Sequence, residues 1–213
     1  DKLSWQKILL TKAKINLMPG RHITQRSLDT VAPLGVVDDG LGLDYFIGTN
    51  DEVKPEDIPA PHRLGYVAFV IGANHYTKKM PIEKWQELCL KLNYPVILIG
   101  GPAEQAEAEK IASVNEGLIY SACQKFTINE CADLLRKSRL VVSHDTGFQY
   151  IACAFHKQVI ALWGGTSPKL DLGPYYGTAF PNANPVKYEN IVRDLWCQPC
   201  SKYGTKRCPL GHF

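Results

Sequence analysis

Residues 141–155, VVSHDTGFQYIACAF, read as a short apolar strand that is followed at once by a helix. After the junction, apolar side chains recur at the spacing of one helix face, at Phe148, Ile151, Ala152 and Phe155. The junction itself holds Asp145, Thr146 and Gly147. A carboxylate at such a position is typical of a helix N-cap, and the N–H groups at a helix start also bind anions. The stretch therefore predicts a strand–helix unit with either a capped end or an anion site.

The same alternation extends on both sides of this unit. Apolar strands are expected at 64–72, 95–101, 117–122, 139–143 and 158–164. Helices are expected at 81–92, about 103–113, 127–138 and from residue 147. The third of these helices starts with Thr127 and has Glu130 three positions later, which is the capping-box pattern. Near-continuous apolar strands that alternate with helices predict an α/β fold, a doubly wound Rossmann-like parallel sheet covered on both faces.

The residues before this alternation of strands and helices have a different sequence pattern. Residues 1 to about 35 look helical, with Trp5, Ile8 and Leu9 on one face and a second helical stretch at 23–34. Residues 41–47 resemble a short strand. Residues 48–63 carry four acids and three prolines and little to bury, which is typical of a linker. We therefore divide the chain into 1–62, a short helical part plus linker, and 63–213, a Rossmann-like domain with a cysteine-containing tail.

Composition excludes several classes of protein. Of the 213 residues, 45% are hydrophobic and 21% are charged, as in an ordinary globular protein, and the net charge of +3 is too small to indicate a nucleic-acid binder. No apolar run approaches the roughly 18 residues of a membrane-spanning helix, and the first residues lack a signal-peptide pattern. Cys89, Cys131 and Cys153 fall on apolar helix faces. An odd total of seven cysteines, with no export signal, favours the reducing cytoplasm.

Four loops follow the predicted strands at the edge of the sheet where ligands bind. They are GANHYTKKM at 72–80, GGPAE at 100–104, SHDTG at 143–147 and WGGTSPK at 163–169. Glycines allow the backbone to approach a ligand, and helix N-termini present N–H groups, so this rim suits a phosphate or diphosphate. The phosphate-binding loop of NTPases and the dinucleotide fingerprint are both missing, as is the nucleophile elbow of hydrolases. These absences argue against assigning the chain as an NTPase, a nicotinamide dehydrogenase or a hydrolase.

Five segments together resemble a known family. They are GANHYTKKMPIEKW, PVILIGGPAEQAEAEKIA, FTINECADLLRKSRLVVSHDTGFQYIACAF, VIALWGGTSPKLDLGPYYG and CQPCSKYGTKRCPLGHF. In order and spacing, from about Leu64 to Phe213, they resemble the carboxyl-terminal half of the ADP-heptose:lipopolysaccharide heptosyltransferases, glycosyltransferase family 9. The resemblance implies the GT-B fold, with residues 63–213 as the nucleotide-sugar-binding domain and residues 1–62 as a remnant of the acceptor-side domain plus linker.

The resemblance also implies an activity. It is inverting, metal-independent transfer of heptose from ADP-heptose to a lipopolysaccharide core acceptor, with no cofactor. Such a transfer needs a base to deprotonate the acceptor hydroxyl. We expect that base in the amino-terminal domain, in sequence that this chain lacks, and so expect the chain alone to be inactive. The implied partners are the nucleotide sugar and a lipid-linked oligosaccharide at the inner membrane surface, which suggests a cytoplasmic, peripherally associated protein.

Donor-binding roles follow from the resemblance, position by position. Lys78 is expected to pair with the diphosphate, although Met80 replaces the usual Trp, and Asn74 is expected to contact phosphate. Glu104 is expected to accept ribose hydroxyls and Phe126 to lie beside the adenine. Each has an ordinary alternative that stays open: a solvated lysine, a turn amide, a first-turn helix acid and a core aromatic. The neighbouring Lys79 is expected in solvent.

The resemblance also implies roles for the residues at the strand–helix junction, Asp145 to Gly147. The N–H groups of Thr146 and Gly147 are expected to meet a phosphate, Asp145 to cap the helix, and Thr166 to line the same rim. The family usually has a histidine where this chain has Tyr150, so a contact made by that imidazole is in doubt, and we consider His144 as a partial substitute.

The end of the chain has the pattern C-x2-C-x7-C-x3-H, formed by Cys197, Cys200, Cys208 and His212. These are the ligand types of a Cys3His zinc site. The x7 gap is unusual for zinc, and the resemblance accounts for the pattern without metal, so we expect reduced thiols and no metal ion. Two other functions stay open: an enzyme of the UDP-N-acetylglucosamine 2-epimerase type, and a non-catalytic nucleotide-binding module.

Overall fold

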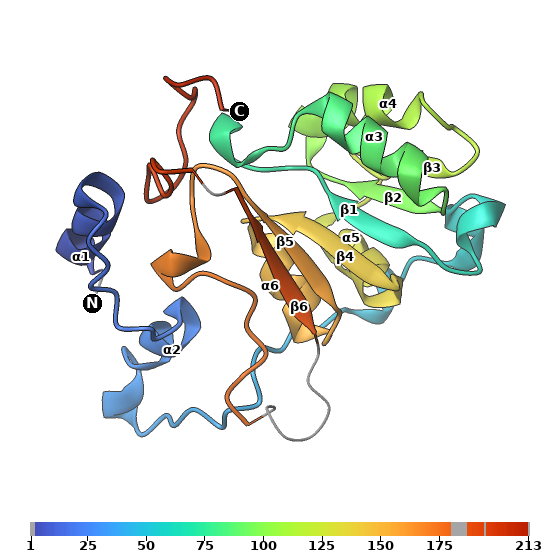
Figure 1. The fold of residues 1–213 in the computed structure, drawn as a ribbon. Coiled ribbons are helices and arrows are strands. Elements are labelled where there is room, and N and C mark those ends of the chain that lie inside the picture. Colours follow the sequence, from blue (N-terminus) through green and yellow to red (C-terminus); the bar gives the residue numbers. More distant parts are fainter. Residues whose placement is uncertain (1–2, 180–186, 194, 213) are drawn as a thin grey trace.

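The computed structural model describes residues 3–179, 187–193 and 195–212 (Figure 1). Its centre is a six-stranded sheet in the order β3-β2-β1-β4-β5-β6, and every pairing is parallel. The strands are β1 Val67–Val70, β2 Val96–Ile99, β3 Ile119–Ser121, β4 Leu140–His144, β5 Val159–Trp163 and β6 Tyr188–Val192. Because β1 lies between β2 and β4, the strand order reverses there, and the loops after β1 and β4 meet at the carboxyl edge of the sheet.

Helices cover both faces of the sheet, as the sequence predicts. On one face lie α3 Ile82–Leu92 and α4 Gln105–Ala112, whose Trp85, Cys89 and Ile111 pack with Phe69 in one core cluster. On the other face lie α5 Ile128–Lys137 and α6 Gly147–Ala154 (Figure 1). The expected doubly wound α/β arrangement is confirmed.

The capping box of α5 is also confirmed. The Thr127 hydroxyl accepts a hydrogen bond from the Glu130 backbone N–H, at 3.3 Å, and the Glu130 carboxylate accepts one from the Thr127 N–H, at 2.6 Å. These two bonds satisfy N–H groups that have no partner within the helix, which fixes where α5 begins.

One expected strand is absent, and one strand was missed. Residues 41–47 form no strand. Gly42 has a positive φ angle, which an extended strand does not have, and the Gly40 carbonyl before it accepts hydrogen bonds from the N–H groups of Thr178 and Ala179. Conversely, β6 was not expected. Its residues, YENIV, lie at the edge of the sheet and are mostly exposed. Because neither face of this strand is buried, its sequence lacks the apolar pattern from which a strand is predicted.

The segment 48–63 is more tightly packed than its composition suggested. It forms three short 3-10 turns, Thr49–Asp51, Pro55–Asp57 and Ala60–His62. Val53, Ile58 and His62 are buried. The Val53 N–H donates to the carboxylate of the fully buried Asp133 on α5, at 2.8 Å. The expectation of a linker with little to bury is therefore wrong.

The amino-terminal part is helical but turns a different face inward. It contains α1 Ser4–Ile8, a π-helical turn Leu9–Ala13, α2 Ile23–Leu28 and a 3-10 turn Ala32–Leu34. Trp5 and Ile8, which we expected on a packed apolar face, are 58% and 49% exposed, whereas Leu10 is buried. Lys14 joins this part to the tail, since its ammonium donates to the carbonyls of Cys197 and Pro199 at 2.7 and 2.9 Å.

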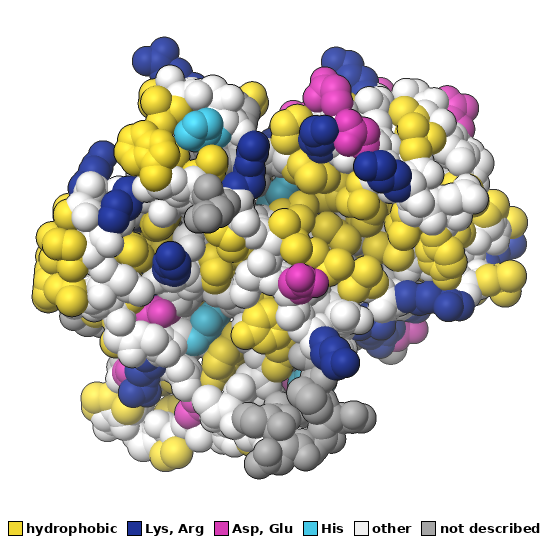
Figure 2. Space-filling view, viewed as in Figure 1, with side chains coloured by type: hydrophobic (Ala, Val, Ile, Leu, Met, Phe, Trp, Pro, Cys, Tyr) yellow, Lys and Arg dark blue, Asp and Glu magenta, His cyan; other side chains and the backbone are white. Residues whose placement is uncertain are grey.

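The face that carries α3 and α4 is only partly covered. Figure 2 shows hydrophobic side chains gathered over this face of the sheet, beside basic side chains. Here Leu162 and Ile191 line a second pocket of about 380 Å³, with Lys84 and Arg193 at its rim. Among the helices of the described residues, none is long and apolar enough to span a bilayer.

Candidate functional site

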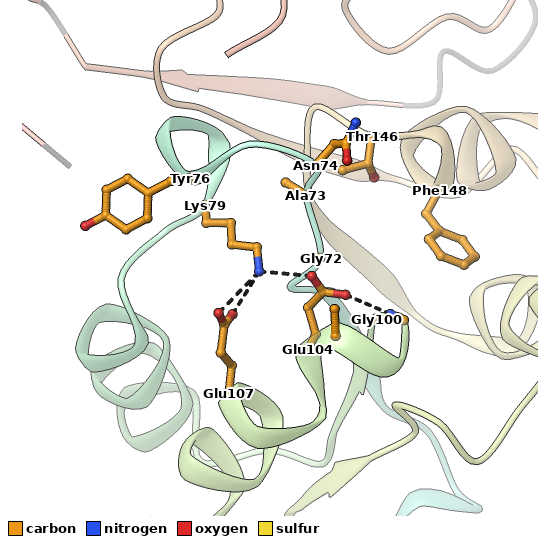
Figure 3. A pocket seen from close by; sticks show the side chains of 12 residues that line it. Gly72, Ala73, Asn74, Tyr76, Lys79, Gly100, Glu104, Glu107, Thr146 and Phe148 are labelled. Carbon is orange, nitrogen blue, oxygen red and sulfur yellow. Dashed lines mark hydrogen bonds and ion pairs between the residues drawn. The ribbon is translucent and has the colours of Figure 1, made fainter. Parts of the chain in front are cut away.

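A pocket of about 620 Å³ opens at the carboxyl ends of β1, β2 and β4 (Figure 3). It is lined by Gly72, Ala73, Asn74, Tyr76, Lys79, Gly100, Gly101, Ala103, Glu104, Glu107, Thr146 and Phe148. Close backbone approach forms one wall. A Cβ at Gly100 would lie 2.9 Å from the Cβ of Glu104 and 3.0 Å from the sulfur of Cys123, so only glycine fits there. The pocket thus lies at the reversal point of the strand order, where open α/β sheets bind ligands.

One side of the pocket carries a lysine between two carboxylates. The Lys79 ammonium lies 2.9 Å from Glu104 Oε1 and 3.2 Å from Glu107 Oε2. The second oxygen of Glu104 accepts the N–H of Gly101 at 3.0 Å. The expectation that Lys79 points into solvent is wrong. Two successive lysines in a loop do not reveal that both side chains turn inward to pair with carboxylates, as they do here.

The start of α6 forms another side. Thr146 is the N-cap residue, and its side chain makes no capping hydrogen bond. Its hydroxyl is nevertheless buried without a partner in the structure. Gly147, the first helical residue, is exposed, and a Cβ placed on it would meet nothing within 4 Å. The helix start is therefore open to an incoming anion, which the uncapped N–H groups and the helix dipole favour.

Asp145 does not cap this helix, contrary to expectation. Its carboxylate pairs with the Lys78 ammonium at 2.7 Å and accepts the hydroxyl of the fully buried Thr166 at 3.0 Å. Lys78 also donates to the Asp145 carbonyl, at 3.1 Å. Lys78, Asp145 and Thr166 therefore form one bonded group, which joins the loops after β1, β4 and β5 directly beside Thr146.

The carboxyl-terminal tail makes hydrogen bonds to the loops that carry Lys78 and Thr166. The Gln198 side-chain amide donates to the carbonyls of Trp163, Gly164 and Thr166, at 3.3, 2.6 and 3.0 Å. Thr205 of the tail exchanges hydrogen bonds with Thr77, the residue before Lys78. The tail thus fixes the loops that carry Thr166 and Lys78, a contribution that the sequence did not indicate.

Tyr150, which stands where the family usually has a histidine, and His144, which we considered as its partial substitute, both make structural contacts. The Tyr150 hydroxyl donates to the Leu172 carbonyl at 2.8 Å, and its ring meets His22 edge to face. His144 is completely buried, and its Nε2 accepts the Met80 N–H at 2.8 Å. Burial lowers the pKa of His144 to about 4, so the imidazole is neutral. His144 is not among the residues that line the pocket of about 620 Å³, and whether it substitutes in part for the family histidine stays a prediction.

The predicted residues therefore fall into three groups. Asn74, Glu104 and Thr146 line the pocket, and Gly147 lies beside them. Lys78, Asp145 and Thr166 form the adjoining bonded group. Phe126 packs against the core cluster beneath α5 and α6 and is not among the residues that line the pocket. Whether any of them contacts a nucleotide stays a prediction.

Sequence reasoning missed Lys79, Glu107 and Phe148 as pocket residues. Phe148 was counted in the apolar stripe of its helix, and it does pack on the core, but it also lines the pocket. Glu107 had a usable signal, because it lies three positions after Glu104 at the start of a helix, where the two side chains share a face.

Charge in the site is nearly balanced. Lys78 and Lys79 face the carboxylates of Asp145, Glu104 and Glu107. Two lysines beside three carboxylates provide no net positive field, so an anion must gain its stabilisation from the start of α6 and from the direct approach of Lys78.

The terminal cysteines lie near His212. The sulfur of Cys197 is 3.5 Å from His212 Nδ1, and the sulfur of Cys208 accepts the His212 N–H at 3.4 Å. Within the described part of the chain, no group of three or more His, Cys, Asp or Glu side chains is arranged to hold a metal ion. None of the seven cysteines, all of which are described, is in a disulfide. The expectation of reduced thiols without metal stays a prediction.

Comparison with models of protein families identifies the family of the chain. The model of glycosyltransferase family 9 (heptosyltransferase) matches residues 7–209. The chain belongs to this family. The match extends through the amino-terminal helical part and the tail, so both are segments of a glycosyltransferase family 9 protein as well as the sheet between them.

Curated relatives of this family 9 chain are heptosyltransferases by name. It is 31% identical over 90 residues to lipooligosaccharide heptosyltransferase 2 of Haemophilus influenzae, which is 40% of this chain and 26% of that one. It is 30% identical over 118 residues to lipopolysaccharide heptosyltransferase 1 of Salmonella typhimurium, 52% of this chain and 35% of that one. The chain thus spans about a quarter to a third of the length of these relatives.

Solved structures show the same fold. One from Veillonella parvula, described as glycosyl transferase family 9, aligns with a TM-score of 0.66 at 19% identity, over 86% of this chain and 54% of that one. The E. coli heptosyltransferase WaaC with ADP aligns with a TM-score of 0.55 at 20% identity, over 83% and 52%. At this identity the likeness shows the fold of the family 9 chain, which agrees with the α/β sheet expected for a GT-B protein.

Proposed function

We propose that this chain is the nucleotide-sugar-binding half of an enzyme that transfers heptose from ADP-heptose to a lipopolysaccharide core acceptor. Membership of glycosyltransferase family 9 and the names of the curated relatives support this activity. The observation that carries it is the uncapped start of α6 at the reversal point of the sheet, with Lys78 held beside it. Residues 63–213 are the donor-binding domain, and residues 1–62 belong to the acceptor-side domain and its connection.

The donor lies across the loops after β1, β2 and β4 in this proposal. Its diphosphate meets the N–H groups of Thr146 and Gly147, and Lys78 turns toward it from Asp145. Charge-assisted bonds of this kind are about twice as strong as neutral ones. Asn74, which lines the pocket, adds an amide donor, and Thr166 keeps Asp145 in place.

The nucleoside occupies the pocket itself. Glu104 accepts the ribose hydroxyls, since each of its oxygens has one protein partner in the structure and retains acceptor capacity. The adenine packs against the aromatic wall. Phe148 lines the pocket and is the nearer candidate for this contact, while Phe126 packs on the same core cluster and supports it.

The reaction breaks the bond between the sugar C1 and the phosphate oxygen of ADP-heptose and forms a bond from C1 to the acceptor oxygen. ADP leaves with the electron pair, and Lys78 and the α6 N–H groups stabilise the negative charge that develops on it. The acceptor hydroxyl gives its proton to a base that we place in the amino-terminal domain. Transfer inverts C1 and proceeds without metal, in the cytoplasm, on an acceptor at the inner membrane surface.

Two alternatives differ from this proposal, one in the nucleotide that it binds and the other in its lack of activity. An enzyme of the UDP-N-acetylglucosamine 2-epimerase type would prefer UDP, and the cysteine-containing tail together with the order of the DTG, WGGT and GP segments argues against it. A non-catalytic module would bind a nucleotide without transferring a sugar, and adding the acceptor-side domain would give no activity.

Titration calorimetry with ADP, UDP and GDP tests the proposal. We expect ADP to bind most tightly. Lys78→Met should weaken ADP binding by about 10- to 100-fold, since it removes a bond to a charged group. Lys84→Met is the matched control, because Lys84 is more than half exposed and, within the described part of the chain, its ion pair is with the exposed Glu87 on α3. Tighter binding of UDP than of ADP would favour the epimerase. Equal binding by the Lys78 and Lys84 variants would remove Lys78 from the site.

A further inference from the structure

Lys79 joins two walls of the pocket. It lies in the loop after β1, whereas Glu104 and Glu107 lie in the turn and helix after β2. Figure 3 shows the Lys79 side chain and both acids converging. The side chains of Lys79, Glu104 and Glu107 are 19%, 12% and 38% exposed, so this is not an ordinary surface ion pair.

The electrostatics show that the lysine is held as a cation. Burial disfavours its charged form, but hydrogen bonds and charge attraction from Glu104 and Glu107 outweigh burial, so the pKa of Lys79 is raised. The two carboxylates would repel each other without this cation between them.

The orientation of Glu104 depends on this arrangement. One of its oxygens is fixed by the Gly101 N–H at 3.0 Å and the other by Lys79 at 2.9 Å. A carboxylate has about four acceptor sites, and these bonds use two. The remaining sites keep a defined direction only while both partners are present. Without Lys79, repulsion from Glu107 would allow Glu104 to rotate about its bond with Gly101.

We propose that Lys79 is a positioning residue that holds the Glu104 carboxylate ready for the ribose hydroxyls, and so sets the preference for a nucleotide with an intact ribose. This inference rests on the proposed function, in which Glu104 binds the ribose. It assigns no contact between Lys79 and the diphosphate, which separates its role from that of Lys78.

The test compares ADP with 2′,3′-dideoxy-ADP, which has the same base and diphosphate but no ribose hydroxyls. In the unmodified chain, calorimetry should show ADP binding about tenfold more tightly or better. Lys79→Met should weaken ADP binding by about 5- to 30-fold and leave dideoxy-ADP binding unchanged, so the preference is lost. Lys79→Arg, which keeps the charge, should restore most of it, and Lys84→Met should change neither nucleotide.

Each outcome decides something different. If the unmodified chain binds neither nucleotide, or binds both equally, the ribose assignment in the proposed function fails and Lys79 loses its role with it. If the unmodified chain prefers ADP and Lys79→Met keeps that preference, or weakens both nucleotides equally, only the Lys79 inference is overturned. If Lys79→Met unfolds the chain, Lys79→Gln serves as the second variant, because its amide can still donate to one carboxylate. Lys79→Gln should lose part of the preference for ADP over dideoxy-ADP. An unchanged preference in that variant would also overturn the inference.

Discussion

His144 illustrates how a single buried side chain ties the site to the core. It ends β4, one position before Asp145, and accepts the Met80 N–H, so it links the loop after β1 to the strand beside it. Its ring also meets Trp85 edge to face, at 5.4 Å between centroids. The residue next to the site therefore acts in packing and loop placement, and its neutral form is the one that can accept this bond.

His144 should make the stability of the chain depend on pH. Its pKa is about 4 in the folded state, lowered by burial and by the charges of Lys79 and Lys78, against 6.5 ordinarily. Below pH 6.5 the unfolded chain gains a proton that the folded chain does not bind. The contribution of this group to stability should therefore fall by about 3 kcal/mol as the pH falls from 6.5 toward 4, and this contribution should not change above pH 7.5.

Urea denaturation at several pH values measures this effect. His144→Gln keeps an acceptor for Met80 but cannot titrate, so its curve between pH 4 and 6.5 should be flatter than that of the unmodified chain. Burial also lowers the pKa of His62, and that contribution remains in both proteins, so only the difference is assigned to His144. Parallel curves for the two proteins would contradict the prediction.

At the scale of an element, α6 carries the anion site through its backbone. The helix has eight residues, and no side-chain capping bond is made by its N-cap residue. The N–H groups of its first turn are therefore available for a ligand, and their number does not depend on any side chain. Such a site is visible in sequence only as a strand–helix junction with small residues.

Gly147→Pro tests this element. Proline is well accepted at the first helical position, and Thr146 before it is extended at φ −143° and ψ 171°, which suits a residue before proline. The substitution removes one N–H group, so ADP affinity should fall by about tenfold or more while the melting temperature changes little. Gly147→Ala keeps the N–H and meets nothing within 4 Å, so it should bind ADP as the unmodified chain does. Equal affinities for the two variants would exclude the Gly147 N–H as a phosphate donor.

At the scale of the whole molecule, segments distant in sequence hold the sheet and its rim together. Residues 48–63 pack on α5 through Val53 and Asp133. The tail packs on the loops after β1 and β5 through Gln198 and Thr205. The amino-terminal helices contact the tail through Lys14. The arrangement of the rim therefore depends on contacts that cross most of the chain length.

Asp133→Ala measures one of these contacts. It would leave the Val53 N–H buried without a partner and release Arg136 and Lys137, which pair with the same carboxylate. The free energy of unfolding should fall by about 1–3 kcal/mol, mostly from the unsatisfied N–H, since the two cations are partly exposed and return to water. Asp133→Asn keeps an acceptor and should lose less in urea denaturation. Equal losses for Asn and Ala would show that the charge, and not the bond to Val53, is what matters.

The sequence by itself determined the alternation of strands and helices from 67 to 163, because these strands are near-continuous apolar runs and each helix has one apolar stripe. It also located the loops of the site, because parallel strands bring their carboxyl ends to one edge. Only the tertiary structure decided that Lys79 turns inward, that Asp145 binds Lys78 instead of capping α6, and that β6 completes the sheet. These outcomes depend on which groups, distant in sequence, come within hydrogen-bond distance of one another. The local spacing of residues in the sequence does not predict such contacts.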